Sequence, residues 1–310
     1  MPAESASSQG LPVIAGYEIH GELGRGPLGK VYRAREIATG RIAVFRGFAR
    51  PAGADEDQWT QAVDRFKELL AAHERVDSHS AIQKIFAFGE QGPLFYIATE
   101  YFDGRTIRSI IDNDGPQPLA FAIEIFRQVA DAVDYAAANG QCHTDITPYN
   151  ILLTPNGSVR VINFGLGHTR DKTGSPYVSP EQLAGFEGDL RSDVYGMGAV
   201  IYELLSGKAP FTGETGHEVV AKVRSSIPAP LLNQPPFVRD VLAKMLAKSP
   251  SYRYETAVEA ILDLEQQRAP LEVRTGMISA AEFGRYQAQK RHTLADYSLS
   301  QMDLMRIQPR

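Results

Sequence analysis

The hydrophobic pattern of the chain changes near Gly104. Between Tyr17 and Thr99, short runs rich in β-branched and aromatic residues are separated mostly by Gly, Asp or Pro, which is typical of strands. One amphipathic helical pattern, from residue 55 to residue 74, interrupts them. After Gly104 the patterns are mostly helical, and residues 194–205 are apolar nearly all round, as in a buried helix. This order predicts an α+β fold of two lobes, β-rich and then helical, with a cleft between them.

The composition is that of an ordinary globular protein. The chain has 310 residues, of which 43% are hydrophobic, and a formal net charge of -5, so nucleic acid is not an expected partner. A single cysteine, Cys142, rules out an internal disulfide and fits a reducing compartment. The sequence has neither a signal peptide nor an apolar run long enough to cross a membrane, so we expect a cytoplasmic protein without a membrane segment.

A glycine-rich motif, "GRGPLG", contains Gly24, Gly26 and Gly29. A dinucleotide-binding glycine motif is followed by a helix, whereas the segment that follows here, "KVYRAREI", has the pattern of a strand. A glycine loop between antiparallel strands is typical of a backbone that covers nucleotide phosphates. A plain hairpin turn is the alternative.

A second motif lies in the helical half, in the stretch "CHTDITPYNILLTPNGSVRVINFG". Asp145 and Asn150 are five positions apart on a predicted loop, and a predicted hairpin then leads to Asn163, Phe164 and Gly165. An Asx-rich turn would explain this spacing only if the other motifs were accidental. Those motifs follow in order, as "SPYVSPEQ", "RSDVYGMGAVIYELLSGKAPF" and "AKSPSYRY".

Together these residues resemble the protein kinase family, and specifically its bacterial members that are similar to eukaryotic serine/threonine kinases. The resemblance implies a protein-kinase-like domain over residues 17–268, with an N-lobe at 17–101 and a C-lobe at 102–268. Residues 1–16 are expected to be a disordered N-terminus, and residues 269–310 a C-terminal tail with some helical character.

The resemblance also assigns roles to individual residues. Thr99 would be the gatekeeper, the backbones of Glu100 and Phe102 would bind adenine at the hinge, and Asp193 would hold the catalytic loop. Glu181 would pair with Arg253 to brace the helical lobe. The implied nucleotide-binding residues are Gly24, Gly26, Gly29, Val31, Ala43, Thr99, Glu100, Phe102 and Leu152, among which Val31, Ala43 and Leu152 would sandwich the adenine ring.

Four positions depart from the family pattern. Matching "IAVF" to the family's V-A-I-K motif puts Phe45 where the phosphate-binding lysine stands, and strand alternation then points Arg46 to the opposite face. Thr144 replaces the arginine of H-R-D, Thr147 replaces a lysine that would contact the γ-phosphate, and Asn163 replaces the metal-chelating aspartate. The helix glutamate that normally pairs with the lysine is also unassigned, since Glu68, Leu69 and Leu70 all compete for its position.

These departures favour a pseudokinase with a regulatory or scaffolding role. Phosphoryl transfer depends on positioning and charge, and losing one preorganised contact typically costs roughly 10²–10³ in rate. Asp145 would remain as a vestigial or weak base, while Asn150 and Asn163 would make at most a weak Mg²⁺ site. ATP would bind weakly or without metal, and a protein partner of unknown identity is expected. An atypical but active kinase that uses Asp145 as its base is the alternative, and a binding module without nucleotide is the third hypothesis.

Overall fold

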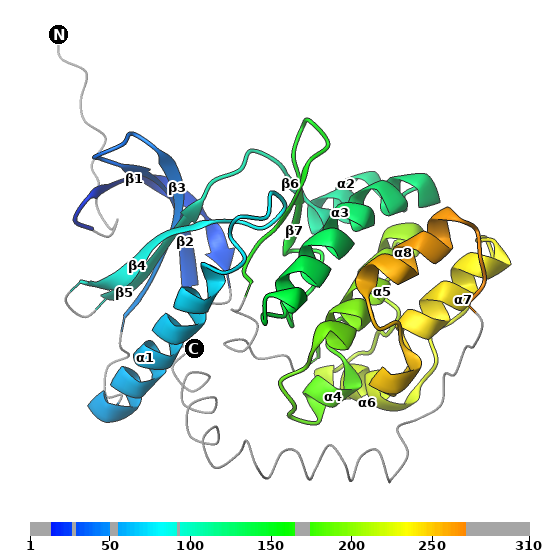
Figure 1. The fold of residues 1–310 in the computed structure, drawn as a ribbon. Helices are drawn as coiled ribbons and strands as arrows, with labels where there is room; N and C mark the ends of the chain where they lie inside the picture. The colour runs from blue at the N-terminus through cyan, green and yellow to red at the C-terminus, as the bar shows by residue number, and fades with distance from the viewer. Residues whose placement is uncertain (1–13, 27–28, 50–54, 92–93, 165–173, 271–310) are drawn as a thin grey trace.

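The computed structural model describes residues 14–26, 29–49, 55–91, 94–164 and 174–270. The N-terminal part is an antiparallel sheet with the strand order β1-β2-β3-β5-β4 (Figure 1). Its strands are β1 (Tyr17–Gly26), β2 (Gly29–Glu36), β3 (Ile42–Ala49), β4 (Ile85–Gln91) and β5 (Leu94–Glu100). The expected strand-rich lobe is therefore present, and β3 is its central strand.

Helix α1 (Glu56–His73) packs against one face of this sheet. Its expected apolar face is buried against Phe95 and Ile97 of β5. That face consists of Trp59, Val63, Phe66 and Leu70. Burying a side chain of this size contributes roughly 1.5–3 kcal/mol, so this contact accounts for the docking of α1 on the sheet.

The opposite face of the sheet is covered by aromatic side chains. Phe45 of β3 stacks on Tyr96, with ring centroids 5.5 Å apart, and its ring also lies 6.1 Å from that of Tyr17. Ile14, which precedes the first strand, packs into the same cluster and is buried. Residues 1–13 lie outside the described residues. The outer face of the central strand is therefore buried.

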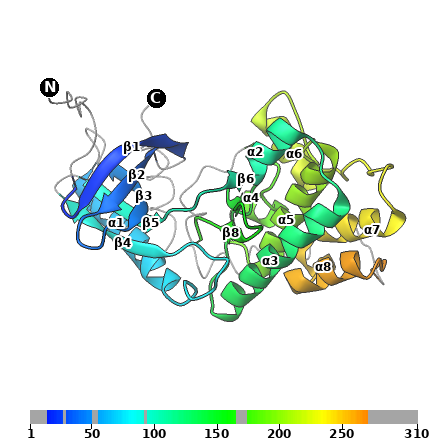
Figure 2. The same ribbon diagram turned by 90° about the horizontal axis from the view of Figure 1, so that it is seen from above.

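The C-terminal part is helical, apart from a small sheet with the order β6-β7-β8 (Figure 2). The short strands are β6 (Arg105–Thr106), β7 (Ile151–Leu153) and β8 (Val159–Val161). The helices are α2 (Ile107–Asp114), α3 (Leu119–Ala138), α4 (Pro180–Leu183), α5 (Leu190–Ser206), α6 (Gly216–Ser225), α7 (Pro236–Met245), the 3₁₀ turn η2 (Pro250–Tyr252) and α8 (Ala257–Glu265). The expected α+β two-lobed fold is confirmed. The tail beyond residue 270 lies outside the described residues.

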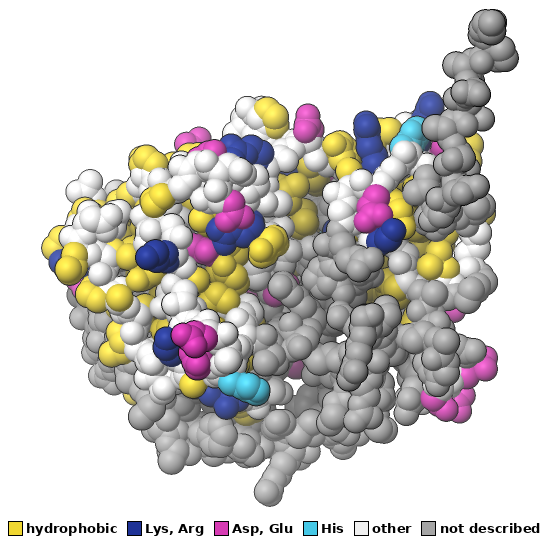
Figure 3. All heavy atoms as spheres, turned by 180° about the vertical axis from the view of Figure 1, so that it is seen from behind, with side chains coloured by type: hydrophobic (Ala, Val, Ile, Leu, Met, Phe, Trp, Pro, Cys, Tyr) yellow, Lys and Arg dark blue, Asp and Glu magenta, His cyan; other side chains and the backbone are white. Residues whose placement is uncertain are grey.

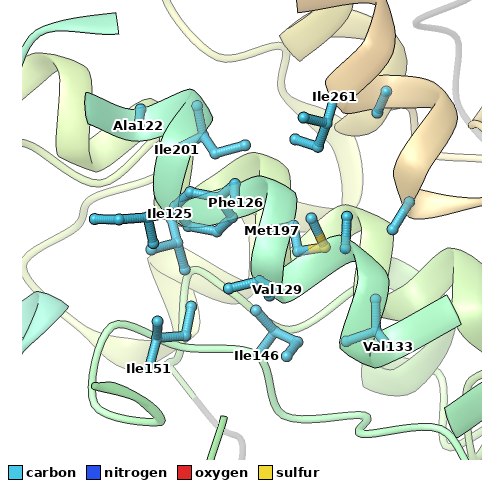
Figure 4. Close-up of a cluster of buried hydrophobic side chains, with 14 of the residues drawn as sticks. Ala122, Ile125, Phe126, Val129, Val133, Ile146, Ile151, Met197, Ile201 and Ile261 are labelled. Atoms are coloured by element: carbon cyan, nitrogen blue, oxygen red, sulfur yellow. The ribbon is translucent and has the colours of Figure 1, made fainter. Parts of the chain in front are cut away.

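The core of the helical lobe forms between α3, α5 and α8. Phe126 and Val129 of α3 face Met197 and Ile201 of α5, and Ile261 of α8 closes the cluster (Figure 4). Helix α5 is buried along nearly its whole length, as its apolar sequence predicts. A capping box at Asp189 begins this helix, and Gly207 ends it with a φ of 75°, a backbone conformation that favours glycine.

A buried ion pair braces the end of the helical lobe. Arg253 donates from Nη1 to Glu181 Oε1 at 2.6 Å and from Nη2 to Glu181 Oε2 at 2.8 Å. Arg253 also donates to the backbone carbonyls of Ala247, Lys248 and Arg191. The expected contact between Glu181 and Arg253 is therefore present, and every side of the guanidinium is satisfied.

Charges of both signs are mixed on the surface shown in Figure 3, where acidic and basic side chains of the described residues are interspersed. No helix among the described residues is both long enough and apolar enough to span a bilayer.

Candidate functional site

Phe45 and Arg46 lie on opposite faces of β3, as expected for neighbours in a strand. Each of them, however, lies on the face that was expected for the other. Phe45 lies in the aromatic cluster on the outer face of the sheet, fully buried. Arg46 points to the other face, where its Nη1 donates to Oδ1 of Asn163 at 2.6 Å. The cation on this strand, rather than the phenyl ring, therefore reaches the helical lobe. The family motif matches one position later than expected, as Ala43-Val44-Phe45-Arg46.

The same register reassigns the residues beside the expected adenine site. Val31 of β2 pairs with Arg46, and Thr99 of β5 pairs with Val44, so these four side chains share one face of the sheet. Ala43 alternates to the opposite face and is fully buried. The expectation for Ala43 is therefore corrected to Val44, whereas Val31 and Thr99 lie on the face that the assignment requires.

The hinge after β5 has an unforeseen neighbour in Gln83. The Gln83 Nε2 donates to the backbone carbonyl of Glu100 at 2.8 Å, and the Glu100 N–H donates to the carbonyl of Lys84 at 2.9 Å. Phe102 lies under the guanidinium of Arg160, 4.8 Å from its ring centre. Thr99 Oγ1 is buried and has no hydrogen-bond partner within the described residues. The hinge carbonyl of Glu100 is thus already bonded within the protein, whereas the buried Thr99 hydroxyl has no partner among the described residues.

The glycine motif connects β1 and β2 as an antiparallel pair. Gly24 lies opposite Val31, and Gly26 lies opposite Gly29. Gly24 has a φ of 153°, which a residue with a side chain rarely adopts. The strand expected after the motif is present, while residues 27–28 at the tip lie outside the described residues.

The loop that carries Asp145 is held from below by Asp193 of α5. Asp193 accepts hydrogen bonds from the backbone N–H groups of His143 and Thr144, at 2.8 and 2.6 Å, as the resemblance implied. The His143 ring is buried against Phe164, with centroids 4.6 Å apart, and its Nδ1 accepts from the Asp145 N–H. Thr144 has a φ of 60°, which is strained for a β-branched residue. The loop geometry is therefore fixed by contacts other than those of Thr144's side chain.

A chain of hydrogen bonds joins the two lobes through Arg46, Asn163, Asn150 and Asp145, and we call it the inter-lobe network. Asn163 accepts the bond from Arg46 at its Oδ1, and its Nδ2 donates to Asn150 Oδ1 at 2.8 Å. Asn150 in turn donates from Nδ2 to the Asp145 carbonyl at 2.8 Å and to Asp145 Oδ2 at 3.0 Å. Asn163 adopts a φ of 68°, which asparagine tolerates better than most residues. Residues that are far apart in the sequence thus form one continuous chain of hydrogen bonds.

The inter-lobe network does not fit a magnesium ion. The two amide oxygens that would ligate it, on Asn150 and Asn163, both accept hydrogen bonds within the protein. The Arg46 guanidinium is bonded directly to one of them. Mg²⁺ needs near-octahedral oxygen ligands and relies on carboxylates, of which the network offers only Asp145. Within the described part of the chain, no group of three His, Cys, Asp or Glu side chains forms a metal site.

Comparison with known proteins identifies the family. The protein kinase domain model matches residues 17–263.

The chain belongs to the protein kinase family.

Its relatives include bacterial serine/threonine-protein kinases. This kinase domain is 33% identical to serine/threonine-protein kinase PknB of Mycolicibacterium smegmatis over 268 residues, covering 80% of this chain and 42% of that protein. It is 32% identical to PknB of Mycobacterium tuberculosis (strain ATCC 25618 / H37Rv), covering 86% and 46%. Serine/threonine-protein kinase PrkC of Bacillus subtilis is 31% identical, with 83% and 41% covered. The chain thus spans less than half the length of these relatives.

Among the described side chains of α1, the kinase helix glutamate has no counterpart facing Arg46. Glu68 of α1 is exposed, whereas Leu70 is buried against the sheet and Leu69 is partly buried beside it. Within the described residues Arg46 forms no ion pair, and burial lowers its pKa to about 10, so it stays charged at neutral pH. The family's lysine–glutamate pair is therefore represented by a cation alone.

Two functional contacts of this kinase domain escaped sequence analysis. His73 continues the apolar face of α1, three positions after Leu70, and its Nε2 lies 2.8 Å from the Gln83 carbonyl. Because Gln83 also bonds to the Glu100 carbonyl, the end of α1 is linked to the hinge. The sequence signal for these contacts was that His73 and Gln83 are polar residues at positions where the surrounding pattern is apolar.

The remaining kinase-motif positions lie in the helical lobe. Thr147 is buried, and its Oγ1 has no hydrogen-bond partner within the described residues. Leu152 is half-buried in β7, opposite Thr106 of β6. Burial, and then the charges of Asp193 and Asp189, raises the pKa of Cys142 to about 12, so its thiol is unreactive at neutral pH.

Proposed function

We propose that this kinase domain is a pseudokinase, with a regulatory or scaffolding role and with weak or metal-independent nucleotide binding. The observation that supports the proposal most is the inter-lobe network, in which both amide oxygens at the metal-ligand positions accept hydrogen bonds from protein donors. A domain of this kind would act through a protein partner, which the sequence does not identify, in the cytoplasm.

The charge balance of the network explains why transfer should be inefficient. Asn163 and Thr147 supply no charge where the family has an aspartate and a lysine, and no carboxylate pairs with Arg46 within the described residues. Each missing preorganised contact typically costs roughly 10²–10³ in rate, although such losses are not additive. Arg46 retains the positive charge expected of the lysine, so phosphate binding is less impaired than the chemistry.

An active, atypical serine/threonine kinase is the second candidate. It is favoured by the intact hydrogen bonds around Asp145, namely the one that Asn150 donates to Asp145 and the two that the backbone of the catalytic loop donates to Asp193. The names of the bacterial relatives also point to this activity. The third hypothesis, a module without nucleotide, was motivated by Phe45 filling the phosphate site. Because Phe45 packs on the outer face of the sheet, that motivation is lost.

Transfer of radiolabelled phosphate from ATP to the protein itself and to a generic acceptor protein distinguishes the first two candidates. We expect no turnover above that of the Asp145→Asn variant, with or without Mg²⁺. Turnover on the order of 1–100 per second that disappears in Asp145→Asn would refute the pseudokinase proposal and establish the active kinase.

A further inference from the structure

The guanidinium of Arg46 lacks the compensating charge that such a group usually has. Its guanidinium donates a hydrogen bond to the neutral Asn163 amide, and within the described residues no carboxylate lies at ion-pair distance. A charge withdrawn from water without a counter-charge costs free energy, so it is seldom found without a ligand or a partner. A bound anion would supply the counter-charge that Arg46 lacks.

Asn163 keeps that charge available. An aspartate at the same position would form an ion pair with Arg46 and would neutralise it, whereas the amide only orients the guanidinium through one hydrogen bond. Asn163 is itself held by Asn150, so its oxygen rather than its nitrogen faces Arg46. The inter-lobe network thus holds a cation directly against the asparagine that stands where the family has its metal-binding aspartate.

We propose that Arg46 takes the place of the metal, so that this site binds the polyphosphate of a metal-free nucleoside triphosphate and Mg²⁺ weakens the binding. A guanidinium presents a planar fork of donors that matches phosphate oxygens. Mg²⁺ occupies the same phosphate oxygens and reduces the charge of the nucleotide, so it competes with Arg46. The inference rests on the nucleotide binding in the proposed function and reverses the expected sign of the metal effect.

Calorimetric titration of ATP into the full chain, in EDTA and in saturating MgCl₂, tests the proposal. Hydrogen bonds to charged groups contribute about 1.5–3 kcal/mol, so we expect ATP to bind roughly tenfold or more tightly in EDTA. Arg46→Met should lose this difference, and Arg46→Lys should keep part of it. Asn163→Asp should reverse it, because the new carboxylate both neutralises Arg46 and supplies a metal ligand.

Arg41→Met is the matched control. It removes another arginine of the same lobe, one paired with Glu36 on the surface and away from the network, so the effect of EDTA should be unchanged. Thermal unfolding of each variant checks that the site is still folded. Adenosine and inorganic tripolyphosphate, titrated in EDTA, should both bind more weakly than ATP.

Tighter binding of ATP in MgCl₂ to the wild type would overturn the inference, as would an Arg46→Met variant that is folded and binds like the wild type. Equal affinity for adenosine and ATP would also overturn it. Absence of ATP binding in both buffers would overturn it too and would remove nucleotide binding from the proposed function, while leaving the inefficient transfer of that proposal standing. Conversely, phosphate transfer that depends on Asp145 would refute the pseudokinase proposal, whereas this inference is decided by the sign of the magnesium effect.

Discussion

Two arginines, Arg253 fully buried and Arg46 half-buried, illustrate different uses of the same side chain. Arg253 is bonded to both carboxylate oxygens of Glu181 and to three backbone carbonyls, so its charge and its donors are satisfied. Arg46 is bonded to one neutral amide. The first arrangement is complete and has a structural role, whereas the second is electrostatically incomplete and is suited to a ligand. The number of hydrogen-bond partners around the guanidinium, more than its burial, distinguishes the structural ion pair of Arg253 from the candidate site at Arg46.

Arg253→Met should produce the largest effect. It leaves the buried Glu181 carboxylate without its partner, and breaking a buried pair in this way typically costs about 3–5 kcal/mol. Urea denaturation followed by circular dichroism measures the loss. The double variant Glu181→Leu/Arg253→Met should recover part of it, because no unpaired charge remains. A loss below about 1 kcal/mol would mean that the brace is not structural.

Lys248, next to the brace, tests how a buried cation behaves without a carboxylate. Its Nζ donates to the Val223 carbonyl at 2.7 Å and lies 4.1 Å from the centre of the Phe211 ring. Burial, and then the charge of Arg253, lowers the pKa of Lys248 from 10.5 to about 7. Between these two values the unfolded chain binds more protons than the folded one, so the free energy of unfolding should rise with pH from about 7 to 10.5.

The expected rise from Lys248 is on the order of 3–5 kcal/mol, since one unit of pKa difference corresponds to about 1.4 kcal/mol and the two pKa values lie about 3.5 apart. Urea denaturation at several pH values checks it against Lys248→Met, in which the rise should be absent. The same slope in both proteins would show that Lys248 does not carry the effect.

Arg46→Met should have the smallest effect on stability. Because the guanidinium is bonded to one neutral group, the variant loses one hydrogen bond and also removes a poorly compensated charge. We expect a change within about 1 kcal/mol in either direction, since a net hydrogen bond contributes about that much. The same urea assay measures it. A loss as large as that of Arg253→Met would contradict the comparison and make Arg46 a second brace.

Local pattern carried most of the fold prediction. The apolar faces of α1 and α3, the buried α5 and the glycine motif between two strands all follow from residue spacing, and the ion pair of Glu181 with Arg253 follows from the family motifs. His73 and Gln83 were missed because each looks like an isolated polar residue in an apolar run. Their hydrogen bonds join segments that only the folded chain brings together.

The sequence by itself determined the order of the elements, the two lobes and the retention of Asp145, Asn150 and Asn163. It also determined that Phe45 and Arg46 lie on opposite faces of one strand, because side chains in a strand alternate. Which of the two faces the helical lobe was decided by the tertiary structure. Both faces of the central strand carry mainly apolar side chains, so its pattern does not mark which face points to the helical lobe, and a shift of one residue exchanges the faces. Ile14 and the aromatic rings of Tyr17 and Tyr96 cover Phe45, and this packing directs Arg46 to Asn163.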